Sequence, residues 1–113
     1  MHYQGGCHCG KVRIEIDGEL EAAVACNCSI CARKGALLWA VPRAGLRVSA
    51  ADEDIGAYTF NNNAIRHRFC RACGIHAFAE DVAAGGSAYV NIRCLEDVDV
   101  KAIPVIEFDG ASA

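Results

Sequence analysis

The segment GGCHCGKVRIEID, residues 5–17, contains the two patterns that decide the fold. From position 11 to position 17, charged residues alternate strictly with the apolar residues Val12, Ile14 and Ile16. A period of two is typical of a β-strand with one buried face. A Cys-x-Cys pair among glycines precedes this strand, and the pair Asp17-Gly18, which favours a hairpin turn, ends it.

Short strands of the same kind are expected along the rest of the chain. Turn residues interrupt the apolar runs at intervals of roughly 8 to 12 residues, and no long window has a helical period. The expected strands cover residues 20–25, 36–41, 46–49, 58–60, 65–70, 75–80, 88–94 and 105–108. We therefore predict a mainly β fold, a small β-sandwich or open barrel of short antiparallel strands with little helix. Residues 26–31 and 52–54 are expected to be loops.

Length and charge restrict the classes of function. The chain has 113 residues, and we expect residues 1–113 to form a single domain. Lys and Arg total 11 against 14 for Asp and Glu, and the net charge of −3 argues against a nucleic-acid partner. No apolar stretch approaches the roughly 20 residues that span a bilayer, and no leader pattern is seen at the N-terminus. We expect a cytoplasmic protein without a membrane partner, where a reducing environment favours metal binding over disulfides for the 8 cysteines.

Two cysteine pairs have the spacing of a structural zinc site. Cys70 and Cys73 are separated by two residues and followed by Gly74, which suits a tight turn with positive φ and backbone N–H groups that face the sulfurs. Cys7 and Cys9 are two residues apart, so both side chains lie on the same side of an extended segment. Together the pairs supply the four thiolates of a closed tetrahedral Zn²⁺ site. The alternatives for these four residues are disulfides or a redox Cys-x-x-Cys pair.

The third cluster, Cys26-Asn-Cys28-Ser-Ile-Cys31, has three sulfurs and no fourth ligand at similar spacing. Catalytic zinc sites keep three protein ligands and an open position, so this cluster predicts a second, catalytic Zn²⁺ whose soft ligands suit a thiol substrate. The alternative is a second structural zinc completed by Cys94 or by a histidine. Cys94 follows Ile92 in a strand pattern, and free cysteines often act as small buried hydrophobic residues.

Cations lie beside the cysteine clusters. Arg33 and Lys34 directly follow the third cluster and are candidate substrate-binding residues, because they can pair with a substrate carboxylate or compensate thiolate charge. The alternative for them is ordinary solvated surface, as it is for Arg66, Arg68 and Arg71. We assign no metal to the histidines His8, His67 and His76. For the aromatic residues Trp39 and Phe60 we expect core packing, with the lining of a pocket as the alternative.

An ordered set of motifs resembles one known family. The motifs are GGCHCG (5–10), CNCSIC followed by ARKGA (26–36), VP (41–42), FCRACG (69–74) and VNIRCL (90–95). Over nearly the whole chain they resemble the glutathione-dependent formaldehyde-activating enzyme family, which includes centromere protein V-like domains.

The resemblance implies a zinc-dependent carbon–sulfur lyase with a compact β fold. It implies two Zn²⁺ ions per chain, one structural and one catalytic, and a small thiol such as glutathione as partner. Glutathione would add to formaldehyde to form S-hydroxymethylglutathione. Matched motif by motif, the structural ligands are Cys7, Cys9, Cys70 and Cys73, and the catalytic ligands are Cys26, Cys28 and Cys31.

Two other functions are compatible with the residues. One is a non-catalytic, zinc-stabilised module that binds a protein partner, which predicts two filled metal sites and no thiol binding. The other is a redox sensor, in which oxidation releases metal from the three-cysteine cluster first because its thiolates are more accessible.

Overall fold

The smaller of the two sheets contains the two strands nearest the N-terminus. The computed structural model describes residues 1–112. In the three-stranded sheet, β2 lies between β1 and β5, and both pairings are antiparallel. The bounds are β1 (His2–Gly6), β2 (Arg13–Asp17) and β5 (Leu46–Ser49).

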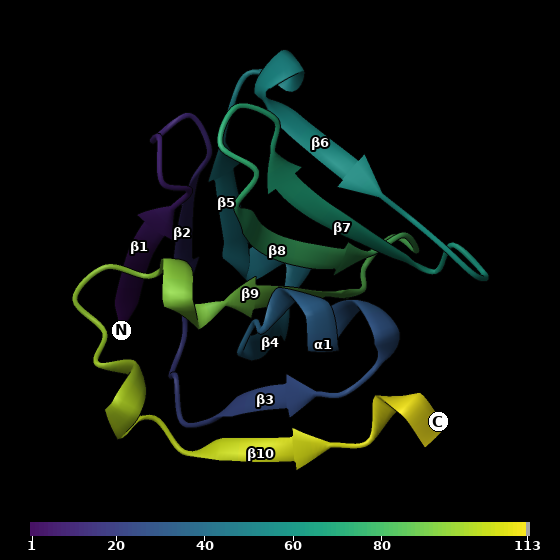
Figure 1. Ribbon diagram of the computed structural model, residues 1–113. Helices are drawn as coiled ribbons and strands as arrows, with labels where there is room; N and C mark the ends of the chain where they lie inside the picture. Colours follow the sequence, from purple (N-terminus) through teal and green to yellow (C-terminus); the bar gives the residue numbers. More distant parts are fainter. Residues whose placement is uncertain (113) are drawn as a thin grey trace.

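The larger sheet has seven strands in the order β10-β3-β4-β9-β8-β7-β6. Their bounds are β3 (Ala23–Cys26), β4 (Leu38–Pro42), β6 (Ile55–Tyr58), β7 (Ile65–Cys70), β8 (His76–Asp81), β9 (Ser87–Asn91) and β10 (Val105–Phe108). Neighbouring strands are antiparallel apart from β3 and β10, which run side by side in the same direction (Figure 1).

Helical structure is limited to short segments. Within the described residues there is one α-helix, α1 (Ser29–Lys34). Single 3₁₀ turns cover Arg43–Gly45, Asp52–Asp54, Ile92–Cys94, Val100–Ala102 and Gly110–Ser112. None of the helices among residues 1–112 has the length and apolar character needed to cross a membrane.

One cluster of buried side chains joins the two sheets. From the smaller sheet it contains Ile14 and Ile16 of β2. From the larger sheet it contains Trp39, Val90 and Phe78, which are cross-strand neighbours on β4, β9 and β8. Since successive residues of a strand point to opposite faces, the residues next to this row project from the other face of the larger sheet.

The predicted fold class, mainly β with little helix, is confirmed. Some details of the predicted strand arrangement were wrong. Asp17-Gly18 does not close a hairpin between residues 11–17 and 20–25, because both edges of β2 are occupied by β1 and β5 and the chain crosses to the other sheet. β1 was missed because its sequence, HYQGG, has no apolar alternation. The strands are not all antiparallel, since β10 returns beside β3.

Three other segments also differ from their predicted structure. The third cysteine cluster is not a loop throughout, since α1 begins at Ser29 after Cys28 and is too short for its period to be recognised. Residues 52–54 form a 3₁₀ turn instead of a loop. The strand expected over 88–94 ends at Asn91, whose side chain accepts a hydrogen bond from the Arg93 N–H and begins another 3₁₀ turn.

A buried carboxylate ties two strands and a turn together. Glu80 on β8 is 5% exposed and accepts hydrogen bonds from Arg43 Nε at 2.8 Å, Arg68 Nη1 at 2.9 Å and Arg66 Nη1 at 3.1 Å. Burial by itself would raise the pKa of Glu80, but the arginine hydrogen bonds outweigh it and hold the pKa below its ordinary value. The ionised form therefore stabilises the fold above the unfolded-state pKa, and this contribution is lost as the pH falls through the lower folded-state pKa.

We expect Glu80→Gln to lower the free energy of unfolding at pH 7 by about 2–4 kcal/mol, because three guanidinium groups lose their shared anion. The difference from wild type should shrink as the pH falls below 4.5, the ordinary pKa of the carboxyl. Urea unfolding at pH 7 and at pH 4 measures both effects. Glu15→Gln, at a carboxylate that is 48% exposed, is the matched control and should cost less than about 1 kcal/mol. Equal losses in the two variants would contradict this account.

Candidate metal centres and the adjoining cavity

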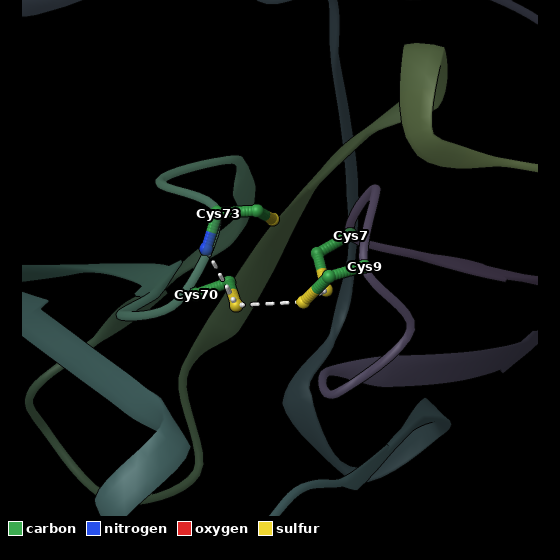
Figure 2. A group of neighbouring side chains, drawn as sticks. All are labelled: Cys7, Cys9, Cys70 and Cys73. Carbon is green, nitrogen blue, oxygen red and sulfur yellow. Dashed lines mark hydrogen bonds between the residues drawn. The ribbon is translucent and has the colours of Figure 1, made fainter.

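Four cysteines from two distant loops meet where the two sheets approach each other. Cys7 and Cys9 come from the loop between β1 and β2, while Cys70 ends β7 and Cys73 lies in the turn before β8. Their four sulfur atoms all lie within 4.8 Å of one another. Figure 2 shows the two pairs facing each other, with Cys9 Sγ 3.5 Å from Cys70 Sγ and 3.6 Å from Cys7 Sγ.

The turn after β7 is shaped to hold thiolates. Gly74 has φ +82°, a backbone conformation that favours glycine, and its N–H donates to the Cys70 carbonyl at 2.8 Å. The Cys73 N–H faces Cys70 Sγ at 3.4 Å. Backbone N–H groups of Ile75 and Cys9 lower the pKa of Cys73 to about 6. The turn thus stabilises negative charge on sulfur, as its sequence predicted.

This donor set fits a tetrahedral metal ion. Zinc–sulfur bonds of about 2.3 Å place the sulfurs of a tetrahedron about 3.8 Å apart, close to the separations observed here. A disulfide needs about 2.05 Å, and all eight cysteines are free. Cys7 and Cys70 are buried, and four sulfurs complete the coordination shell. The four-cysteine cluster could therefore hold one metal ion with no position left for a substrate.

The second cluster is formed by a strand end and a helix start. Cys26 ends β3, Cys28 precedes the first residue of α1, and Cys31 lies one turn further along. Their sulfurs also lie within 4.8 Å of one another, and within residues 1–112 this group includes no fourth Cys, His, Asp or Glu. Burial and the neighbouring Cys28 raise the pKa of Cys31 to about 12. Ionising three thiols this close together costs free energy unless a cation compensates the thiolates, and a metal ion with three protein ligands would supply that cation.

The C-terminal segment holds the three-cysteine loop in place. Asn27 Nδ2 donates to Asp109 Oδ1 at 3.0 Å, and Asn27 Oδ1 accepts from the Ala111 N–H at 2.9 Å. A Cβ atom added to Gly110 would lie 2.5 Å from Cys26 Sγ, so only glycine allows this close approach. The segment after β10 therefore forms part of the site, although it is more than 80 residues away in sequence.

The three cysteines open onto a cavity of about 470 Å³. Cys26, Cys28 and Cys31 all line it, together with residues of α1, six strands of the larger sheet, the turn between β6 and β7, and the C-terminal segment. The cavity lies on the face of the larger sheet opposite the core. A three-cysteine cluster beside a cavity of this size suits chemistry on a small molecule.

Lys34, at the end of α1, is held between two histidines. Its Nζ lies 2.8 Å from His67 Nδ1 and 3.2 Å from His76 Nδ1. Burial lowers the pKa of Lys34 to about 8, while the nearby Cys31 and Cys28 thiolates act in the opposite direction. Burial and the Lys34 charge lower the pKa of His67 to about 4 and of His76 to about 3. Both imidazoles are therefore neutral at pH 7 and can accept hydrogen bonds from the Lys34 ammonium.

Comparison with protein-family models identifies the family. Residues 2–108 match the family model described as "Glutathione-dependent formaldehyde-activating enzyme" (GFA). The chain belongs to this family. A crystal structure of a Rhodobacter sphaeroides protein is similar to the GFA-family chain, with 32% sequence identity, a TM-score of 0.79, and coverage of 91% of this chain and 99% of that chain. The resemblance found in the sequence motifs is confirmed.

Arg33 and Lys34, the two predicted substrate-binding cations, lie in different environments in the GFA-family chain. Arg33 is exposed, donates from Nη1 to the Ser29 carbonyl at 2.8 Å and lines a second hollow of about 380 Å³. Lys34 lies deeper, with its ammonium between the two histidines. Of the flanking arginines, Arg66 and Arg68 bind Glu80 and do not line either space.

Other residues of the GFA-family chain depart from or extend the predictions. Trp39 is in the core as expected, but Phe60 is 37% exposed and lines both the cavity and the hollow, so core packing was the wrong expectation for it. Cys94 belongs to neither metal-binding group of the described chain; its thiol faces the His76 carbonyl at 3.5 Å. Tyr89 and Phe108 were missed as cavity residues, and nothing in their local sequence distinguishes them from core positions.

Proposed function

We propose that this GFA-family protein is a zinc-dependent carbon–sulfur lyase that joins a small thiol to an aldehyde, or separates them, as in the formation of S-hydroxymethylglutathione from glutathione and formaldehyde. The observation that carries the proposal is the three-cysteine cluster, which has no fourth side-chain ligand within residues 1–112 and opens onto the 470 Å³ cavity. The name of the family supplies the two substrates.

The two cysteine clusters would hold two Zn²⁺ ions with different roles. Cys7, Cys9, Cys70 and Cys73 are proposed to hold the structural ion, and Cys26, Cys28 and Cys31 the catalytic ion. When bound, the catalytic zinc supplies a Lewis acid that favours the ionised form of a thiol and stabilises negative charge on an aldehyde oxygen.

The reaction itself is a simple addition. The thiol sulfur forms a bond to the carbonyl carbon, the carbon–oxygen π bond breaks, and the thiol proton ends on the oxygen. The reverse reaction restores the thiol and the aldehyde, and neither direction needs an oxidant or a further reactant. The cavity walls contribute by holding the two reactants close together and by excluding bulk water.

Arg33 and Lys34 have separate roles in this proposal. The Lys34 ammonium lies near the Cys31 and Cys28 thiolates and favours their ionised forms. Arg33 projects into the hollow next to the cavity, where its guanidinium can pair with a carboxylate of the thiol substrate. The two spaces share Ile30 and Phe60, so one molecule can reach both.

Metal analysis combined with exchange kinetics tests the proposal. We expect two zinc ions per chain and a faster exchange between glutathione, formaldehyde and their adduct than in buffer alone, measured by NMR exchange spectroscopy because the uncatalysed addition is already facile. A protein that contains two zinc ions and leaves the exchange rate unchanged would support the non-catalytic module and contradict the proposed enzyme.

A further inference from the structure

The floor of the cavity is a row of four uncharged side chains on four neighbouring strands, and two of the four are alanines. Ala40 on β4 is paired with Tyr89 on β9, Tyr89 with Ala79 on β8, and Ala79 with His67 on β7. All four line the cavity. The two alanines leave space that larger side chains would fill, and residues of α1 and of the turn after β6 line the same cavity.

The walls above this floor are mostly apolar, apart from Asn61 and Asn62 in the turn after β6. They are formed by Ile30 of α1, Phe60 and Ile65 beside the turn after β6, and Phe108 of β10. Within residues 1–112, no Asp, Glu, Lys or Arg side chain lines the cavity. Two of the polar side chains that line it have partners within the protein: the Tyr89 hydroxyl donates to Asp81 Oδ1 at 3.0 Å, and Asn62 Oδ1 accepts from the Ala64 N–H at 3.1 Å.

The uncharged lining of the cavity suits neither formaldehyde nor the charged groups of glutathione, which would bind in the adjoining hollow beside Arg33. Formaldehyde has one carbon atom, whereas about 470 Å³ lies within the range of pockets that hold ligands with many heavy atoms. Glutathione carries two carboxylates and an ammonium group, and charges buried without a partner are strongly unfavourable. The arginines nearest in sequence to the cavity wall, Arg66 and Arg68, are bound to Glu80 and do not line the cavity.

We propose that the cavity receives an apolar carbon chain or ring, carried by the aldehyde part of the adduct. The substrate class is then the adduct of a small thiol with an aliphatic or aromatic aldehyde of several carbon atoms. This inference rests on the proposed function for its carbon–sulfur chemistry. The bond changes are those of the addition given above, with the carbonyl carbon now bearing the apolar substituent in the cavity.

Isothermal titration calorimetry of the zinc-loaded protein with two thioethers tests the cavity without any reaction. S-hexylglutathione and S-methylglutathione have the same charges, lack a thiol and differ only in the length of the apolar chain. Each methylene that enters the cavity should tighten binding about fourfold, so we expect at least a tenfold preference for the hexyl compound and a more negative heat-capacity change. Equal affinities would overturn the proposal.

An Ala40→Glu variant places a carboxylate on the cavity floor and should reduce the hexyl preference to below threefold. Ala40 is exposed to solvent, so the core is not disturbed. Ala57→Glu is the matched control, since Ala57 is an exposed strand alanine on β6 that lies outside the cavity, and it should keep the full preference. A hexyl preference that survives Ala40→Glu would place the chain elsewhere and contradict the proposal. If Ala40→Glu does not fold, the comparison of the two thioethers on the wild-type protein decides alone.

Exchange kinetics with two aldehydes distinguish a failure of this inference from a failure of the proposed function. Exchange kinetics with hexanal and glutathione should show a larger acceleration than kinetics with formaldehyde and glutathione. No acceleration with either aldehyde, together with a clear hexyl preference in calorimetry, would contradict the proposed enzyme and support the apolar cavity. Acceleration with formaldehyde but no hexyl preference would support the enzyme and refute the apolar substrate class.

Discussion

Cys70→Ser is expected to abolish the native fold. Cys70 is fully buried, and its sulfur belongs to the four-cysteine cluster that links the loop after β1 to the end of β7. Structural zinc contributes about 10–16 kcal/mol of apparent binding free energy in small zinc-binding peptides, which equals or exceeds the whole stability of a typical domain. Circular dichroism should show no cooperative melting, and metal analysis should show the loss of one zinc ion.

Cys9→Ser separates the loss of metal from the loss of packing. Cys9 is exposed, so its replacement removes a ligand without leaving a cavity in the core. We expect the same unfolding as for Cys70→Ser. Cys94→Ser is the matched control, because Cys94 is only partly buried and lies outside both clusters, and it should keep both zinc ions and a cooperative melt. A Cys9→Ser protein with a nearly unchanged melting temperature would refute the structural role of this site.

Cys28→Ser is expected to lower the acceleration of thiol–aldehyde exchange by more than about 100-fold, because a serine hydroxyl is a poor ligand for a soft thiolate-bound metal. The fold should persist. Cys28 precedes the first residue of α1 and lies outside the buried core cluster, so we expect the melting temperature to change by no more than about 5 °C. NMR exchange spectroscopy and a thermal melt on the same sample give both values.

Two outcomes would change the assignment of the three-cysteine cluster. A Cys28→Ser protein that loses one zinc and keeps the wild-type exchange rate would show that this cluster is not the site of chemistry. Loss of the fold in this variant would make the cluster a second structural site. Cys94→Ser again serves as the control, and its exchange rate should equal that of the wild type.

Local sequence patterns were sufficient for much of the fold and for the membership of the cysteine clusters. The alternation from position 11 to 17 produced β2 because the period of two is a property of the strand itself. Cys7 and Cys9 lie in a turn after β1 and not in the extended segment that was expected, but their spacing, like that of Cys70 and Cys73 in the turn after β7, still brings the sulfurs of each pair together locally. The pairing of one cysteine pair with the other followed from the need of a tetrahedral metal for four ligands.

The tertiary structure alone decided the cavity and the surroundings of Lys34. Ala40, Ala79 and Tyr89 line one cavity because β4, β9 and β8 are neighbours in the sheet, and strand order depends on long-range pairings that no local period encodes. The same holds for β10, which returns beside β3 and brings Phe108 and Gly110 to the three-cysteine loop. The sequence by itself determined, through the spacing of the cysteines, which residues could bind a metal. The order of the strands determined which side chains surround those cysteines, because contacts between distant segments exist only in the folded chain.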